Sequence, residues 1–341
     1  MTQTTRVRGE AMFKSVSLRY LIGFPMLMGS SVLLTALPAH SNDQDAVATA
    51  RDGVRDLGKN WNGEVNVATQ ALYMELQRSA DRSGVNATMD VSYGPHELQG
   101  MDVFAPEVRP AEPAPVVVYI HGGAMVRGNK INANSEGLIS SNIPTFFARH
   151  GMIGINANYR LVPEVQWPSG PDDLRGILTW VRDNIDEYGG DPDAVFLMGN
   201  SAGGRHVASY LYHEDSHFDD GPGVIGAILS SGSYGASDSE THRVYYGDDA
   251  ALRASRVPLG LLDAYGGPEI PVFLWSAELD PANIEAPVAA MYAKLCAKFE
   301  DCPRFTQFQG HNHVSHIMSI NYADDEVSRA VLEFIHSVTA R

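Results

Sequence analysis

The sequence has few cysteines and few basic residues, and each shortage excludes a class of protein. Its two cysteines, Cys296 and Cys302, do not belong to a His/Cys cluster with zinc-site spacing, so no structural metal is expected. Lys and Arg number 25 against 41 Asp and Glu, the formal net charge is −16, and no run rich in Lys or Arg occurs. Neither nucleic acid nor an anionic membrane surface is therefore an expected partner.

The pairing of the two cysteines stays open at this point. Cys296 and Cys302 lie close together in the sequence, so a disulfide between them would close a short loop. Two free thiols fit the pattern equally well, because a bridge depends on a Cα separation that the sequence does not supply.

Charge is absent from residues 20–37, and this gap marks an N-terminal segment unlike the rest of the chain. Four basic residues precede it, namely Arg6, Arg8, Lys14 and Arg19. The small-residue sequence Leu37-Pro38-Ala39 follows it, so the order predicts a secretory signal peptide over residues 1–39, with translation starting at Met1 or at Met12. The alternative is a membrane anchor, since the segment is nearly long enough to span a bilayer. The Gly and Pro residues of this segment and the small residues at its C-terminal end favour cleavage over anchoring. Cleavage implies a periplasmic or secreted protein without stable membrane insertion.

The composition after the signal peptide is that of a globular protein with a core, at 44% hydrophobic and 19% charged residues for the whole chain. Residues 40–86 form a predicted helical arm, because apolar residues recur every three or four positions, as at Val65, Ala68, Leu72 and Leu76. Residues 88–104 alternate between apolar and polar on either side of Gly94-Pro95-His96, which predicts a β-hairpin. The Pro-rich stretch at 105–115 is too short to separate domains.

From residue 116 onward, short apolar segments alternate with longer helical ones. The apolar segments are 116–120, 152–155, 195–198, 224–229 and 272–275, and the helical ones are 172–185, 202–212, 283–299 and 324–338. Buried strands alternating with helices indicate a doubly wound, mostly parallel α/β sheet, with the hairpin as an antiparallel edge. Residues 87–341 are thus predicted to form one catalytic domain.

A nucleophile motif follows one of these strands. Gly199-Asn200-Ser201-Ala202-Gly203 fits Gly-x-Ser-x-Gly and lies between a predicted strand and a predicted helix. This context is that of a nucleophile elbow, a strained turn that exposes the serine hydroxyl. The elbow also places the Ala202 amide at a helix N-terminus, where it can donate a hydrogen bond to an oxyanion. Further amides are expected from Gly122, Gly123 and Ala124, which follow the strand at 116–120.

A serine nucleophile needs a base and an orienting acid, which follow it in the order acid, then histidine. Asp280 comes directly after the strand at 272–276 and is the predicted acid, with Glu278 as the competing candidate. The loop after the next strand holds His311, His313 and His316, of which His313 is the predicted base. The other two are then polar loop residues without a role. A three-histidine metal site is the alternative, but no matching carboxylates accompany it.

Taken as a set, the motifs resemble those of the α/β-hydrolase superfamily, and among its members the hormone-sensitive-lipase-like and feruloyl-esterase-like carboxylesterases. The motifs are His121-Gly122-Gly123, Tyr159-Arg160-Leu161, Gly189-Gly190-Asp191-Pro192, residues 199–204 and Ala277-Glu278-Leu279-Asp280-Pro281. The resemblance runs from about Tyr93 to the C-terminus. It implies the α/β-hydrolase fold with a small helical cap, a Ser201–Asp280–His313 triad and no cofactor. Two departures are Asn200, where Asp is frequent, and Ala124, where a third Gly is common.

The predicted function is hydrolysis of carboxylic esters of small or aromatic substrates through an acyl-enzyme. Tyr245 and Tyr246, in the segment 232–271 between two core strands, are candidate substrate-binding residues, with packing of the cap against the core as the alternative. An amidase or arylformamidase would use the same triad. A non-catalytic binding module is a further alternative, against which the complete triad argues. The sequence does not indicate an oligomeric state.

Overall fold

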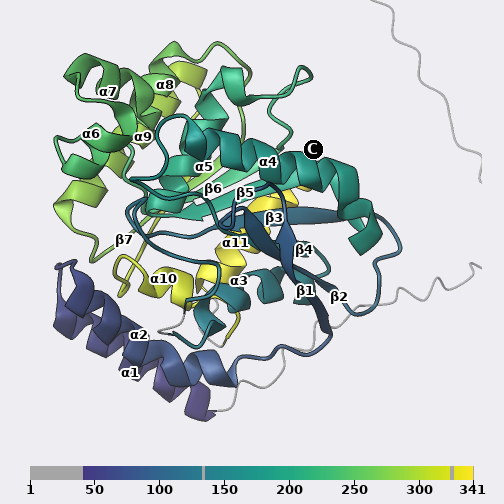
Figure 1. Ribbon diagram of the computed structural model, residues 1–341. Helices are drawn as coiled ribbons and strands as arrows, with labels where there is room; N and C mark the ends of the chain where they lie inside the picture. The colour runs from purple at the N-terminus through teal and green to yellow at the C-terminus, as the bar shows by residue number, and fades with distance from the viewer. Residues whose placement is uncertain (1–40, 133–134, 323–325, 341) are drawn as a thin grey trace, which may run out of the picture. The chain divides into compact units, whose positions relative to one another are not determined.

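The computed structural model describes residues 41–132, 135–322 and 326–340 (Figure 1). The predicted signal peptide at 1–39 lies outside these residues. None of the helices in the described part of the chain is both long and apolar enough to cross a membrane.

The core of the fold is an eight-stranded sheet in the order β1-β2-β4-β3-β5-β6-β7-β8. The strands are β1 (Val85–Ser92), β2 (Gly100–Pro106), β3 (Ala114–Ile120), β4 (Ile153–Ala157), β5 (Gly190–Asn200), β6 (Gly226–Ser230), β7 (Val272–Ala277) and β8 (Arg304–Phe308). β1 pairs antiparallel with β2 and β2 antiparallel with β4, whereas all later pairs are parallel. The predicted parallel sheet with an antiparallel edge is therefore confirmed.

Helices cover both faces of this sheet, because its central strands are apolar on both sides. Val116, Val118 and Ile120 of β3 belong to one buried cluster, and Val117 and Tyr119 belong to another. Successive side chains of a strand point to opposite faces, so one strand contributes side chains to the cores on both faces of the sheet. The first core includes α4 (Ser169–Asn184), α5 (Ala202–Tyr212) and α9 (Ala282–Phe299), and the second includes α3 (Leu138–Arg149) and α11 (Glu326–Thr339). Short 3₁₀ helices occupy Ile185–Tyr188 and Glu214–Ser216.

The predicted helical arm consists of two helices, α1 (Ser41–Leu57) and α2 (Gly63–Ser79), which lie side by side (Figure 1). The break between them follows from Gly58, whose φ is +67°, and from Asn62, whose side chain accepts a hydrogen bond from the Val65 amide as an N-cap. β1 begins at Val85, so the predicted boundary between arm and domain at 86/87 falls inside a strand.

The arm packs against the segment that carries the predicted base. Asn312 donates a hydrogen bond to Thr69 Oγ1 over 2.7 Å, and Gln77 of α2 donates to the carbonyl of Met318 in α10 (Ser315–Met318). Both arm residues are buried. The arm therefore supports the histidine loop directly.

Three short helices between β6 and β7 form the predicted cap: α6 (Glu240–Tyr246), α7 (Ala250–Arg256) and α8 (Pro258–Ala264), grouped in green in Figure 1. The buried Arg205 of α5 joins the cap to the core. Its guanidinium donates to Ser233 Oγ over 2.7 Å and to the Gly235 carbonyl over 3.1 Å.

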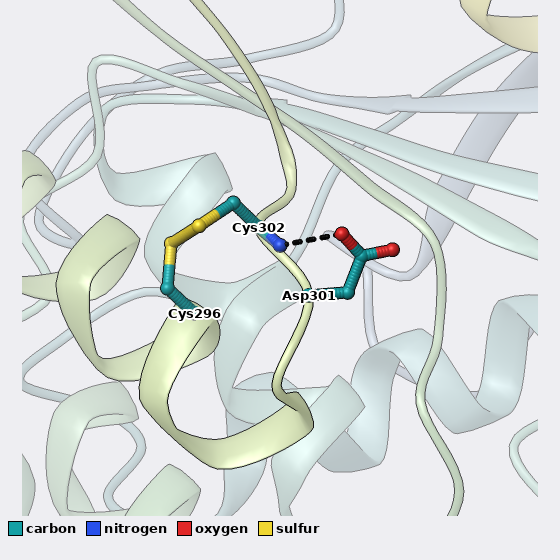
Figure 2. Close-up of a disulfide and its surroundings, with 3 residues drawn as sticks. All are labelled: Cys296, Asp301 and Cys302. Atoms are coloured by element: carbon teal, nitrogen blue, oxygen red, sulfur yellow. Dashed lines mark hydrogen bonds between the residues drawn. A yellow bond between two sulfur atoms is a disulfide. The ribbon is translucent and has the colours of Figure 1, made fainter.

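The two cysteines form a disulfide that joins the end of α9 to the segment before β8 (Figure 2). The Cα atoms of Cys296 and Cys302 lie 4.2 Å apart, and the Cys302 amide donates to the carboxylate of Asp301. Of the two pairing states that the sequence left open, the structure shows the bridge.

Candidate active site

Ser201 lies in a strained turn between β5 and α5. Its φ of +55° is unusual for a residue with a side chain, and its amide donates to the Ser230 carbonyl over 2.9 Å. The flanking glycines permit this turn, because a Cβ at Gly199 would collide with the Gly203 backbone and one at Gly203 with the Ile120 carbonyl. The sequence Gly-x-Ser-x-Gly thus has the geometry of the predicted nucleophile elbow.

Ser201, His313 and Asp280 lie in hydrogen-bond contact, although 112 positions separate the serine from the histidine. His313 Nε2 is 2.8 Å from Ser201 Oγ, and His313 Nδ1 is 2.8 Å from Asp280 Oδ1. The side chains of His313 and Asp280 are 3% and 0% exposed, so water does not compete for this pair. The arrangement has the geometry by which a base removes a proton from a serine hydroxyl.

The carboxylate of Asp280 is held in place by two further donors. Its Oδ2 accepts from Ser231 Oγ over 2.6 Å and from the Ala277 amide over 2.8 Å. Burial alone would raise the pKa of Asp280, but hydrogen bonding and charge from His313, with smaller contributions from His316 and Ser231, leave that pKa below its usual value. Asp280 is therefore an anion that can stabilise a positive charge on His313.

Glu278, the competing acid in the sequence, points elsewhere, because its carboxylate accepts from the Gly310 amide over 2.7 Å. The other two histidines of the loop are not loose polar residues, which corrects the prediction from sequence. His311 and His316 are both fully buried, with His311 Nδ1 3.0 Å from Ser315 Oγ. Burial lowers the pKa of His316 to about 4. Among the described residues no group of three or more potential metal ligands is found.

The loop after β3 places Gly122 and Gly123 beside the serine. A Cβ added at Gly122 would lie 3.2 Å from the Ser201 Cβ, and Gly123 has a φ of +132° that favours glycine. His121 Nδ1 is 2.7 Å from the Gly122 carbonyl oxygen. Because the peptide group is planar and trans, the Gly123 amide on the same peptide points away from His121.

Ala124 and Ala202 complete the predicted set of amide donors. Ala124 also has a positive φ, of +55°, and Ala202 is the first residue of α5. Met125, next to Ala124, belongs to the same buried apolar cluster as Ala202. The role of these amides as donors to an oxyanion stays a prediction.

Lys130 anchors the far end of this loop to the sheet, a role that no motif indicated. Its ammonium is 2.5 Å from Asp102 on β2 and 2.7 Å from Asp90 on β1. Its amide donates to the Asn158 side chain, and its carbonyl accepts from Asn156 over 2.6 Å. The Lys130 and Asp102 side chains are 5% and 2% exposed, so this ion pair is buried.

Two further residues beside the triad make contacts that the sequence did not predict. Trp61, between α1 and α2, meets His313 edge to face with ring centroids 4.7 Å apart. Asn200, the departure from the common Asp, donates to Ser230 Oγ over 3.1 Å and to the His313 carbonyl over 3.4 Å. The elbow is therefore tied to the histidine loop through Asn200.

Tyr245 and Tyr246 do not present a surface to a ligand. They are 2% and 0% exposed and pack with Val257 and Met125 in a buried cluster. The Tyr245 hydroxyl accepts from the Gly170 amide over 2.8 Å. The geometry thus supports the alternative role, in which both residues pack the cap against the core, and does not support substrate binding.

The sheet order, the flanking helices and the strained serine turn define the fold of this chain as the α/β-hydrolase fold. Residues 101–221 match the family model described as BD-FAE. Among curated proteins, the chain is similar to esterase LipC of Mycobacterium tuberculosis, at 32% identity over 34% of this chain and 27% of that protein. It is 37% identical to the probable carboxylic ester hydrolase LipM of the same organism, over 39% of this chain and 30% of the relative. The matches thus span less than a third of the length of these relatives.

Solved structures share the fold over most of the chain. Esterase B of Lactobacillus rhamnosis superposes with a TM-score of 0.65 at 18% identity, covering 81% of this chain and 95% of that one. A structure described as arylesterase gives a TM-score of 0.56 at 18% identity, over 89% of this chain and 99% of the other. These likenesses agree with the α/β-hydrolase fold that the motifs predicted.

Proposed function

We propose that this protein is a serine carboxylesterase that hydrolyses esters of small or aromatic substrates through an acyl-enzyme intermediate. The observation that carries the proposal is the continuous contact from Ser201 Oγ through His313 to Asp280, with 2.8 Å at each step. The names of the relatives support an ester substrate, since they include esterases, a carboxylic ester hydrolase and a para-nitrobenzyl esterase of Bacillus subtilis.

The first half of the reaction acylates Ser201. His313 Nε2 takes the hydroxyl proton as the Ser201 oxygen attacks the ester carbonyl, and Asp280 stabilises the resulting imidazolium without accepting its proton. The negative charge that forms on the carbonyl oxygen is held by the amides of Gly122, Gly123, Ala124 and Ala202. His313 then gives its proton to the departing alcohol, and the acyl group stays on Ser201.

The second half releases the acid. His313 removes a proton from water, the water oxygen attacks the acyl carbonyl, and the Ser201 oxygen leaves with the proton returned by His313. Asp280 keeps His313 in the tautomer that has Nδ1–H toward the carboxylate in both halves. No redox step or cofactor is required by this sequence of proton transfers.

The test is labelling of the mature protein with a fluorophosphonate, followed by mass spectrometry of the modified peptide. We expect a single adduct at Ser201, loss of labelling in Ser201→Ala, and full labelling in Ser209→Ala, a control that removes another buried hydroxyl on α5. An adduct at a different serine, or none with intact protein, would contradict the proposal. Turnover of p-nitrophenyl acetate beside N-formylkynurenine separates an esterase from an arylformamidase.

We also propose that the protein acts in the periplasm or outside the cell. The basic, then uncharged, then small-residue order of residues 1–39 supports this localisation, as does the Cys296–Cys302 disulfide, because disulfides persist in oxidising compartments. Expression with residues 1–39 in a Gram-negative host should give periplasmic protein that starts near His40. Full-length protein retained in the membrane fraction would indicate the anchor instead.

A further inference from the structure

A buried polar cluster leads to Oδ2 of Asp280, the carboxylate oxygen that does not contact His313 Nδ1. It consists of Ser230 and Ser231 at the end of β6, Trp275 on β7 and His316 on α10, all of them 0% exposed. The proposed proton transfers use none of these residues. Four polar side chains that have no access to water require an explanation, since burying such groups costs free energy unless they bond to one another.

The hydrogen bonds of this cluster can run in only one direction. The indole nitrogen of Trp275, which can only donate, is 3.3 Å from Nδ1 of His316. With the Trp275 proton directed at it, Nδ1 must accept, so the Ser230 hydroxyl, whose oxygen is 3.4 Å from Nδ1, can only donate to it. The ring proton of a neutral His316 is then on Nε2. That nitrogen is 3.2 Å from Ser231 Oγ, so His316 donates to the serine.

The same reasoning fixes the Ser231 hydroxyl. Its oxygen is 2.6 Å from Asp280 Oδ2, and a carboxylate can only accept. With His316 donating to the Ser231 oxygen, the serine proton has Asp280 as its acceptor. The chain from Trp275 through His316 and Ser231 ends on one oxygen of Asp280, while the other oxygen contacts His313.

The surroundings of His316 keep it uncharged. Burial lowers its pKa to about 4, although the Asp280 carboxylate favours the protonated form. The other ionisable groups near this chain are His313 and His311 from the histidine loop, and Tyr234 facing Asp280. Ser231 also holds a φ of +43°, a strained value for a residue with a side chain. Backbone strain at the residue that contacts the acid is consistent with a functional demand on its orientation.

We propose that His316 is a positioning residue for the triad: a neutral imidazole that donates through Nε2 to Ser231 and thereby directs the serine hydroxyl onto Asp280. The consequence is that Asp280 presents its other oxygen to His313 in a fixed orientation. The effect on catalysis rests on the proposed function, whereas the tautomer of His316 does not.

The tautomer is tested by nitrogen NMR of the full-length mature protein with ¹⁵N-labelled histidine, without substrate. We expect His316, assigned by the signals missing from His316→Gln, to carry its proton on Nε2 and none on Nδ1 at pH 7. A proton on Nδ1, or on both nitrogens, would overturn the proposal even if Ser201 is the nucleophile. Failure of fluorophosphonate labelling, by contrast, would contradict the proposed function without affecting the NMR measurement of the His316 tautomer.

The positioning role is tested by the pH profile of kcat/KM on a small ester. His316→Leu removes the donor, and we expect kcat/KM to fall about tenfold, the loss of roughly 1.4 kcal/mol of transition-state stabilisation. The acid limb of the profile, where kcat/KM falls as the pH is lowered, should move to higher pH. Without the donor, the Asp280 carboxylate keeps more negative charge on the oxygen that faces His313, and this charge favours the imidazolium. His316→Gln, which offers an amide donor to Ser231, should recover most of both changes.

Two comparisons separate positioning from packing. Ser231→Ala should lower kcat/KM and shift the acid limb as much as His316→Leu does. The double variant should have no lower kcat/KM than either single variant, since both substitutions break the same chain of hydrogen bonds. His206→Leu removes another buried imidazole, on α5, that has no contact with Asp280, and it should leave the acid limb unchanged. An unchanged acid limb in His316→Leu, or additive losses in the double variant, would show that His316 only fills space.

Discussion

The buried histidines near Asp280 and those packed on Tyr159 are held in different ways. On the Asp280 side, the ring nitrogens of both His313 and His316 lie within hydrogen-bond distance of side chains whose donor or acceptor roles are fixed. On the Tyr159 side, His206 is packed edge to face against the Tyr159 ring, with centroids 4.5 Å apart. Neither ring nitrogen of His206 makes a hydrogen bond to any other described residue.

The difference indicates what each side contributes. Side chains in a connected chain of hydrogen bonds have one allowed orientation, so the Asp280 side determines where protons are. Aromatic rings stacked without polar partners determine shape but not proton position. His121 combines the two kinds of contact, because its ring stacks on Tyr159 with centroids 4.5 Å apart while its Nδ1 is 2.7 Å from the Gly122 carbonyl oxygen.

The largest effect is expected at the carboxylate of the hydrogen-bonded side. Asp280→Asn should lower kcat by about 10⁴-fold, because an amide in place of the carboxylate favours the wrong tautomer of His313. Steady-state kinetics on p-nitrophenyl acetate measure it. Glu278→Gln, at the competing acid two residues earlier, is the control and should change kcat less than about tenfold, roughly 1.4 kcal/mol. Comparable losses in the two variants would mean that the acid is misassigned.

Outside the chain of contacts at Asp280, the buried Lys130–Asp102 ion pair anchors the loop after β3. Lys130→Met should reduce the free energy of unfolding by about 3 to 5 kcal/mol, because it leaves the Asp102 carboxylate buried without its cation. Urea denaturation followed by fluorescence gives this value. Asp90→Asn is the matched control, since the Asp90 side chain is 80% exposed and its ion pair should be worth less than about 1 kcal/mol. A small loss in Lys130→Met would show that the loop is held by packing alone.

Acid should destabilise the fold through the buried histidines of both sides. Burial lowers the pKa of His121 and of His316 to about 4 and that of His206 to about 3. Between those values and the ordinary 6.5, the unfolded chain binds more protons than the native one, so stability falls as pH falls through this window. Each histidine contributes up to about 1.4 kcal/mol per pH unit, measured by urea denaturation from pH 7 to pH 4.5. A free energy of unfolding that does not change over this pH range would contradict the neutral state of all three histidines.

The smallest effect is expected where a buried imidazole has no partner. His206→Phe should change the free energy of unfolding at pH 7 by less than about 1 kcal/mol, with a gain as the expected sign, because an apolar ring needs no hydrogen bond. The same variant should reduce the slope of stability against pH below 6.5. Thermal denaturation at pH 7 and pH 5 provides both values, and a loss of several kcal/mol at pH 7 would reveal a polar role for His206.

The nucleophile, base and acid were predictable from sequence, whereas the residues that support them were not. Ser201, Asp280 and His313 could be placed because each follows a recognisable strand, and parallel strands bring such positions to one edge of the sheet. Ser231, His316, Trp61 and Lys130 could not, since their roles depend on neighbours from distant elements and no local motif marks them. The cap helices α6, α7 and α8 have seven residues each, too few to establish a helical period. The helix α3 contains Pro144 inside it, which obscured its pattern.

The contact between the arm and the histidine loop determines how much of the chain the candidate active site needs. Thr69, Gln77 and Trp61 all touch the segment that carries His313, although they precede every hydrolase motif in the chain. A shortened protein that starts at residue 87 would keep all the signature residues, yet it would leave the base without the helices that cover it. A gene fusion or domain swap guided by motifs alone would therefore cut through the active centre, and the practical unit to clone or transplant starts at α1.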